Sequence, residues 1–170
     1  RLLNESQARA GLGSYILDIP TGRWRSSTVL DGIFGIDDQY ERSIEGWSQL
    51  ILPEWRERMS RYVTEEVIGK RGRFDMEYPV IRKSDGSTRW VHGLGELECD
   101  AEDKPLRLIG TISDVTERRQ IETALRLQAA ALYAAANAIV ITDRAGVIEW
   151  VNPAFAQLTG YTAEEALGKN

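Results

Sequence analysis

The chain has 170 residues, of which 21 are basic and 26 acidic, so its formal net charge is −5. This balance excludes a basic surface over the whole chain, and we expect no nucleic-acid partner. The composition, 42% hydrophobic and 28% charged, is typical of a globular protein with a core. The one cysteine, Cys99, excludes an internal disulfide and the usual zinc clusters. No stretch approaches the roughly 20 apolar residues that span a bilayer, so we expect a cytoplasmic segment without membrane contact, although its parent protein could be membrane-anchored.

The first part of the chain predicts short elements. Residues 1–12 mix leucine and alanine with polar residues and end in glycine, which predicts a short N-terminal helix. Residues 15–19 and 23–26 are strand-like runs, and the Pro-Thr-Gly segment between them favours a hairpin turn. Two short helices follow, one ended by Gly35 and one containing Trp47.

A longer amphipathic helix is predicted for residues 53–69, where apolar side chains recur at steps of three and four. Three runs that alternate with period two follow it, at residues 74–80, 88–98 and 106–115. They predict a three-stranded antiparallel meander, and the first hairpin can pair along one of its edges. The fold class is therefore α+β, with the element order β-β-α-α-α-β-β-β.

A connecting helix is predicted for residues 117–136, which contain no glycine or proline and are rich in strong helix formers. One side of this helix carries a heptad seam of only about two heptads, interrupted by a glutamine, so the coiled-coil pattern is weak. The seam consists of Ile121, Leu125, Gln128, Leu132 and Ala135.

The beginning of the pattern then repeats. A helix-capping residue and a closing glycine are eight positions apart in both copies, at Ser27 and Gly35 and again at Asn152 and Gly160. The second copy lacks long meander strands, so residues 137–170 indicate a truncated domain. Because the chain begins without methionine and stops just after a helix-like segment, we expect it to be a piece of a longer protein.

Four ordered motifs resemble the PAS domain, in the PAS plus PAC-motif subtype of bacterial sensor proteins. They are residues 13–22 (GSYILDIPTG), 33–37 (IFGID), 83–91 (KSDGSTRWV) and 108–118 (LIGTISDVTER). Residues 138–170 resemble the start of a second PAS domain. The chain departs from the family at residues 52–55 (LPEW), where His-Pro-Asp-Asp is frequent, and at one extra turn residue, Ser84.

The resemblance implies a PAS fold: a five-stranded antiparallel sheet with helices on one face, flanked by an N-terminal helix and a C-terminal signalling helix. We expect a helix at 1–12, a PAS/PAC sensor domain at 13–116, a connecting signalling helix at 117–136 and the start of a second PAS domain at 137–170. The resemblance also implies a parent signal-transduction protein with a downstream output domain. That domain is either a histidine kinase of a two-component system, or a diguanylate cyclase or phosphodiesterase of cyclic di-GMP signalling.

Strand parity predicts a ligand pocket between the sheet and the helices. Gly93 and Gly95 lie mid-strand on the expected inner face and would leave space there. The alternative is that aromatic and methionine side chains of the helices fill this space. The pocket candidates are Trp47, Trp55, Met59, Tyr62, Val63, Met76, Tyr78, Val91, Gly93, Gly95, Gly110 and Ile112.

We favour a domain without a cofactor. FAD is the alternative, because a tryptophan-rich pocket can stack an isoalloxazine ring. Haem is disfavoured, because parity puts the only histidine, His92, on the outer face. Flavin photochemistry of the kind found in the light-sensing LOV relatives is disfavoured, since their cysteine motif is absent and Ile112 replaces their glutamine. Paired acidic residues have no base, nucleophile or phosphate loop beside them, so we expect neither a catalytic centre nor a metal site.

Asp114 and Thr116 lie where the last strand meets the connecting helix, and Asp114 can cap that helix or pair with Arg89 or Arg118. In the family this junction joins the sensor core to the output helix. We therefore expect a sensory or relay module that responds to a small ligand or to a conformational change. The alternative is a ligand-free dimerisation scaffold. Homodimerisation is expected through Leu2, Leu3 and the outer sheet face around Trp90 and His92.

Overall fold

The computed structural model describes residues 11–170, which form two compact units that divide between Glu117 and Arg118. Most of the predicted helix at 1–12, with Leu2 and Leu3, lies outside the described residues. Leu12 is described and begins the first strand.

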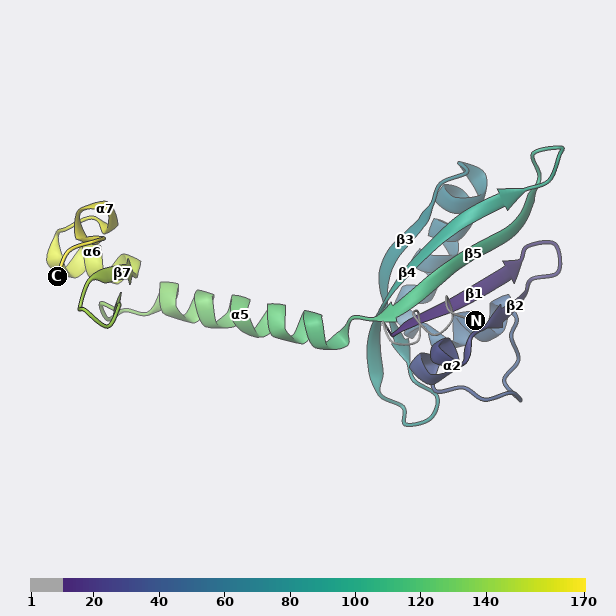
Figure 1. Ribbon diagram of the computed structural model, residues 1–170, viewed down its shortest axis with the longest axis horizontal. Coiled ribbons are helices and arrows are strands. Elements are labelled where there is room, and N and C mark those ends of the chain that lie inside the picture. The colour runs from purple at the N-terminus through teal and green to yellow at the C-terminus, as the bar shows by residue number, and fades with distance from the viewer. Residues whose placement is uncertain (1–10) are drawn as a thin grey trace. The chain divides into compact units, whose positions relative to one another are not determined.

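The first unit is built on a five-stranded antiparallel sheet (Figure 1). In space the strands follow the order β2-β1-β5-β4-β3, so the first hairpin pairs with the last strand of the meander. This arrangement confirms the predicted sheet and the α+β class. The strands are β1 (Leu12–Asp18), β2 (Arg23–Ser26), β3 (Phe74–Ile81), β4 (Thr88–Cys99) and β5 (Pro105–Asp114).

Four helices follow one another between β2 and β3. They are α2 (Thr28–Phe34), α3 (Ile44–Leu50), α4 (Pro53–Arg61) and η1 (Tyr62–Gly69). Each contributes to one core cluster that also contains Tyr78, Val91 and Ile112 of the sheet. The helices therefore cover the inner face of the sheet, as expected.

Local sequence explains where α2 begins and ends. The Ser27 side chain accepts a hydrogen bond from the Leu30 amide at the start of the helix. Gly35 ends it in the left-handed conformation, with φ of 65°, which glycine adopts without steric cost. The helix thereby presents Leu30 and Phe34 to the core, where both are buried.

The single amphipathic helix predicted for residues 53–69 is wrong in its second half. From Tyr62 onward the chain forms the π-helix η1, and the Lys70 amide donates to the Glu65 carbonyl five residues earlier at 3.1 Å. Wider turns change the spacing of residues that share a face. Val63 and Ile68, five positions apart, accordingly line the same cavity.

The second unit begins within α5 (Thr116–Ala134), a helix with no buried residue, shown in green in Figure 1. A hairpin and two short helices follow. They are β6 (Val140–Thr142), β7 (Ile148–Val151), α6 (Pro153–Thr159) and α7 (Ala163–Ala166). Among residues 11–170, no helix is long and apolar enough to cross a bilayer.

Candidate functional site

An apolar cavity of about 100 Å³ lies between the inner face of the sheet and the helices of the first unit. Four predicted pocket residues line it: Trp47, Val63, Tyr78 and Ile112. The other lining residues were not among the predicted pocket residues; they include Tyr15, Leu17, Leu30, Phe34, Phe74 and Leu108. The alternation of side chains along β1 could have identified two of these residues, because Tyr15 and Leu17 alternate with the exposed Ile16.

The polar groups of the cavity wall are uncharged. The Trp47 Nε1–H donates to the Tyr78 hydroxyl oxygen at 3.2 Å, and the Tyr15 hydroxyl donates to the Leu94 carbonyl at 3.4 Å. Burial raises the pKa of both tyrosine hydroxyls well above the ordinary value, so both keep their protons at physiological pH. A ligand in this cavity would meet aromatic and aliphatic groups and neutral hydroxyls, with no charge to balance one of its own.

The other predicted pocket side chains lie outside the cavity lining. Met59 and Val91 are fully buried in the core, and Met76 packs against it. The Tyr62 hydroxyl accepts a hydrogen bond from the Asp75 amide at 3.0 Å, which ties η1 to β3. Trp55 packs edge-on against Trp90, with ring centroids 5.4 Å apart.

The inner-face glycines do not leave space, which corrects the expectation for Gly93, Gly95 and Gly110. A Cβ at Gly93 would overlap the Phe74 ring, and one at Gly95 would overlap the Tyr15 hydroxyl. A Cβ at Gly110 would overlap the Leu94 backbone carbonyl. These glycines therefore permit close packing of aromatic rings and neighbouring backbone against the sheet.

The cavity is small compared with the pockets that hold ligands of the size of FAD or haem. Pockets that hold drug-sized ligands occupy about 300–1,000 Å³, well above the 100 Å³ found here. His92 lies on the outer face, as predicted, with its Nε2 2.8 Å from Asp75 Oδ1. Among residues 11–170, no cluster of three histidine, cysteine or acidic side chains is placed to hold a metal ion.

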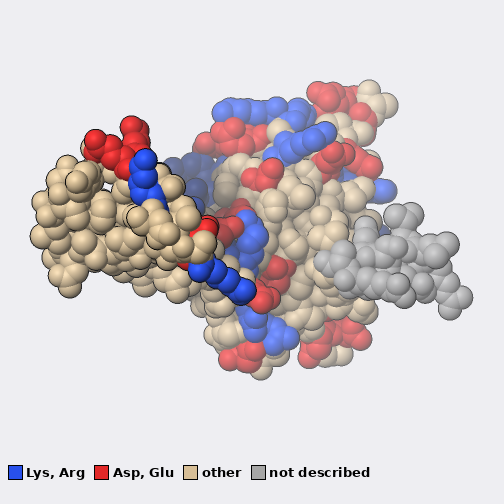
Figure 2. Space-filling view, turned by 60° about the vertical axis from the view of Figure 1, so that its left-hand side comes forward, with Lys and Arg blue, Asp and Glu red and all other residues tan. Residues whose placement is uncertain are grey.

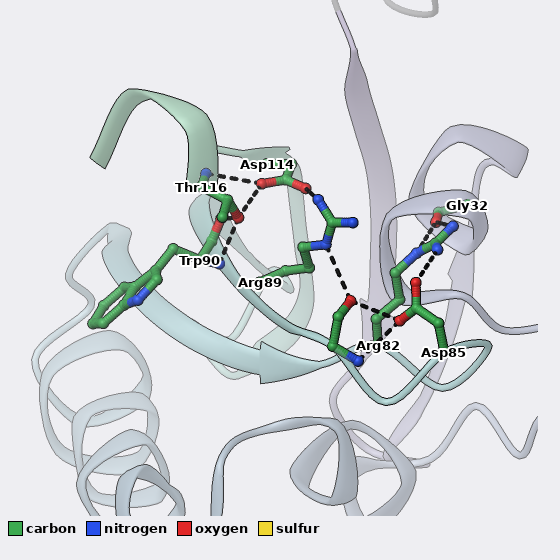
Figure 3. A network of polar contacts seen from close by, with 8 residues as sticks. Gly32, Arg82, Asp85, Arg89, Trp90, Asp114 and Thr116 are labelled. Carbon is green, nitrogen blue, oxygen red and sulfur yellow. Dashed lines mark hydrogen bonds and ion pairs between the residues drawn. The ribbon is translucent and has the colours of Figure 1, made fainter. Parts of the chain in front are cut away.

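The predicted relay residues meet where β5 passes into α5 (Figure 3). Asp114 Oδ1 accepts hydrogen bonds from the Thr116 amide at 2.9 Å and the Thr116 hydroxyl at 2.5 Å. The Thr116 hydroxyl oxygen accepts from the Trp90 amide of β4 at 2.9 Å. The Val115 amide donates to the Trp90 carbonyl at 2.8 Å. The start of α5 is thus fixed to β4 by side-chain and backbone bonds.

Arg89 and Arg118 have different partners. Arg89 Nη1 lies 3.7 Å from Asp114 Oδ2, one of the two pairings anticipated for this carboxylate. Arg118 Nη1 lies 3.2 Å from Glu122 Oε1, one turn further along α5. The contact of Arg89 with Asp114 joins the junction to the sheet.

A continuous set of polar contacts extends from this junction to α2 (Figure 3). Arg89 Nε donates to the Ser87 hydroxyl at 3.3 Å, and that hydroxyl donates to Asp85 Oδ1 at 2.6 Å. Asp85 Oδ2 accepts from Arg82 at 2.8 Å. Arg82 also donates twice to the Gly32 carbonyl of α2, at 3.3 and 3.1 Å. We call the set Gly32, Arg82, Asp85, Ser87, Arg89, Asp114 and Thr116 the polar network.

Asp85 is the acidic centre of the β3–β4 turn. Hydrogen bonds from Ser87, followed by the one from Arg82, hold the pKa of its carboxyl well below the usual range. The group stays ionised and keeps its two partners over the physiological pH range. On the face seen in Figure 2, basic and acidic residues are intermixed.

Comparisons with known proteins agree with this geometry. A family model described as PAS fold matches residues 27–112, and a second PAS fold model matches residues 126–170. A five-stranded antiparallel sheet with helices over one face is consistent with this fold. The chain belongs to the PAS fold family.

Two curated relatives are signal-transduction proteins. Over 164 residues the chain is 26% identical to sensor protein FixL of Bradyrhizobium diazoefficiens, covering 94% of this chain and 32% of that protein. Over 126 residues it is 30% identical to the probable diguanylate cyclase DgcE of Escherichia coli, covering 72% of this chain and 11% of that protein. The chain thus spans about a third or less of the length of these relatives, and it is a PAS module of the sensory signal-transduction type.

Solved structures show the same architecture. A sensory box histidine kinase/response regulator from Burkholderia thailandensis is 27% identical, with a TM-score of 0.65, covering 78% of this chain and 98% of that one. The N-terminal domain of a diguanylate cyclase with PAS/PAC sensor from Marinobacter aquaeolei is 16% identical, with a TM-score of 0.59, covering 64% and 98%. The second likeness concerns the fold alone.

Proposed function

We propose that the first unit senses a small uncharged molecule in its cavity and relays binding to α5 through the polar network. The observation that carries this proposal is the continuity of the network from a helix of the cavity wall to the first residue of α5. The Asp114-Val115-Thr116 junction is the last step of the relay.

The cavity end of the relay is α2. Leu30 and Phe34 of this helix line the cavity, and the Gly32 carbonyl on the same helix accepts both hydrogen bonds from Arg82. A ligand that displaces Leu30 or Phe34 would move this carbonyl, because the short helix moves as one piece. Arg82 would then either move with the Gly32 carbonyl or lose its hydrogen bonds to it.

Contacts between charged side chains hold the middle of the relay together. Arg82 and Arg89 bracket Asp85 and Ser87, and Arg89 reaches the Asp114 carboxylate. Charge-assisted hydrogen bonds are stronger and more directional than neutral ones, so a shift at Arg82 is costly to absorb locally. Population of a second arrangement at Asp114 would loosen or reset the Thr116 contacts that hold the start of α5.

The ligand class follows from the cavity. An apolar cavity of about 150 Å³ in another protein holds benzene or xenon. A volume of about 100 Å³ with neutral walls therefore suits an uncharged molecule of a few non-hydrogen atoms. We place the module in the cytoplasm of a bacterial cell, upstream of a histidine kinase or a cyclic di-GMP enzyme in the same polypeptide.

A ligand-free dimerisation scaffold is the second candidate. It is favoured by the exposed apolar side chains of α5, among them Ile121 at 54% and Leu125 at 59% exposure. A second copy of the chain would cover this seam. The two functions differ in whether the cavity binds anything.

Titration of the protein with xenon and, separately, benzene distinguishes the two candidates, with amide chemical shifts as the readout. The sensor predicts saturable shifts at Leu30 and Phe34, and further shifts at Thr116 and Glu117. Val63→Phe should abolish them by filling the cavity, whereas Ile16→Phe on the outer face should not. Absence of saturable shifts with both probes would exclude the sensor function and leave the scaffold.

A further inference from the structure

Asn152 is a buried polar residue, only 1% exposed, at the start of α6 in the second unit. Its side-chain oxygen accepts hydrogen bonds from the Ile139 amide at 2.8 Å and the Phe155 amide at 3.2 Å. Its side-chain nitrogen lies 3.2, 3.3 and 2.9 Å from the carbonyl oxygens of Leu132, Ala135 and Asn137. One side chain therefore caps the beginning of α6 and the end of α5.

The side-chain oxygen and the side-chain nitrogen of Asn152 have different partners. Its oxygen satisfies an orphan amide of α6, which is the usual task of an N-cap residue. Its two N–H groups are shared among three carbonyls at and just beyond the C-terminal end of α5, where helical carbonyls lack partners along the helix. A ring contact adds to this attachment, with the centroids of Tyr133 and Trp150 5.6 Å apart.

The first unit has the same accepting contacts. Ser27 occupies the equivalent position, and its hydroxyl accepts from the Ser14 amide at 3.0 Å and the Leu30 amide at 3.4 Å. Those amides lie 13 residues before and three after Ser27, the same offsets as Ile139 and Phe155 from Asn152. A serine thus suffices for the two accepting contacts, and the Asn152 side chain adds the three contacts made by its nitrogen.

We propose that Asn152 is a positioning residue that fixes the direction in which α5 joins the second PAS unit. All side chains of α5 are at least partly exposed, so helix packing contributes little to this attachment. The amide and the Tyr133–Trp150 contact hold the helix end against β7 and α6. A rotation of α5 is thereby passed to the second unit, whatever displaces α5 at its other end. This inference goes beyond the ligand proposal and does not depend on it.

The test measures the angle of α5 within the second unit. Spin labels at Arg126→Cys on α5 and Glu164→Cys on α7, both exposed positions, report their separation in the 170-residue chain carrying Cys99→Ser. With Asn152 present, we expect one narrow distance distribution. In Asn152→Ser, which keeps the accepting contacts, we expect that single distance to be lost while the Phe155 amide stays protected from hydrogen exchange.

Asn137→Ser is the matched control, because it exchanges the same residue types but leaves the accepting backbone carbonyl in place; it should keep the narrow distribution. Asn152→Asp is the second variant, since it keeps the shape and the acceptor oxygen while removing the donors, and it should broaden the distribution even if the serine variant unfolds. An unchanged distribution in the folded serine or aspartate variant would overturn the proposal.

Discussion

Thr116 shows how much of the junction depends on one hydroxyl group. Its oxygen accepts from the Trp90 amide at 2.9 Å, and its proton goes to Asp114 at 2.5 Å. The two motifs that contain Arg89 (residues 83–91) and Asp114 and Thr116 (residues 108–118) were visible in the sequence. Arg82 and Gly32 were not, because they lie 50 residues apart and only the tertiary fold brings them together.

Removal of this hydroxyl should destabilise the first unit. Thr116→Val leaves the Trp90 amide without its acceptor, and an unsatisfied partly buried donor costs about 1–3 kcal/mol. Denaturant unfolding should therefore show a lower midpoint for this variant. Thr111→Val, on the outer face of the preceding strand β5, is the control and should change stability much less.

Asp85 gives the first unit a pH dependence. Because its folded-state pKa lies below the ordinary value of 3.8, its contribution to stability is present above about pH 4. That contribution is lost as the pH falls toward the folded-state pKa. Unfolding measured from pH 6 to pH 2 should thus show a smaller acid loss in Asp85→Asn than in the wild-type chain. Equal losses would mean that the turn carboxylate is not held by Ser87 and Arg82.

At the scale of elements, the strands were predictable and the helix geometry was less so. Alternation with period two located β3, β4 and β5 to within a few residues, because one face of each strand is buried. The π-helix η1 was not predicted. Apolar residues five positions apart, such as Val63 and Ile68, also occur by chance in the sequence of an α-helix, so this spacing does not identify a π-helix. The cavity was placed in the correct layer, but side chains from other elements fill the space expected at the glycines.

The surroundings of Gly93 in β4 and of Gly32 in α2 predict opposite effects for substitution by alanine. Gly93→Ala would force a methyl group into the Phe74 ring and should destabilise the unit by about 1–3 kcal/mol. Gly32→Ala meets nothing within 4 Å on the exposed side of α2 and should stabilise it by about 0.5–1 kcal/mol. Thermal unfolding of both variants measures the difference. Destabilisation by both would show that α2 cannot accept a side chain there.

At the scale of the whole molecule, the chain carries two PAS units of one family joined through α5. The internal repeat revealed this plan in the sequence, because the spacing from capping residue to closing glycine is preserved. The donating contacts of Asn152 were not predictable, since its partners at and just beyond the end of α5 lie 15 to 20 residues away and are backbone carbonyls. Dimerisation stays a prediction.

Removal of residues 1–10 tests that prediction. Leu12 pairs with Ser113 in the sheet, so the deletion should leave β1 intact. Light scattering should show a fall from dimer to monomer mass if the N-terminal segment holds two copies together. An unchanged dimer would show that the interface lies on the outer sheet face or on α5. Leu125→Glu would then distinguish the two, because it should weaken only a dimer formed through α5.

The most direct test of the central claim compares the wild-type chain with Arg82→Lys during titration with the apolar probe, xenon or benzene. Lysine keeps the charge but cannot bridge the Gly32 carbonyl and Asp85 with a planar fork. We predict equal probe affinity and equal shifts at Leu30 and Phe34, with the shifts at Thr116 and Glu117 strongly reduced in the variant. Undiminished shifts at Thr116 and Glu117 in Arg82→Lys would contradict the polar network as the route from the cavity to α5.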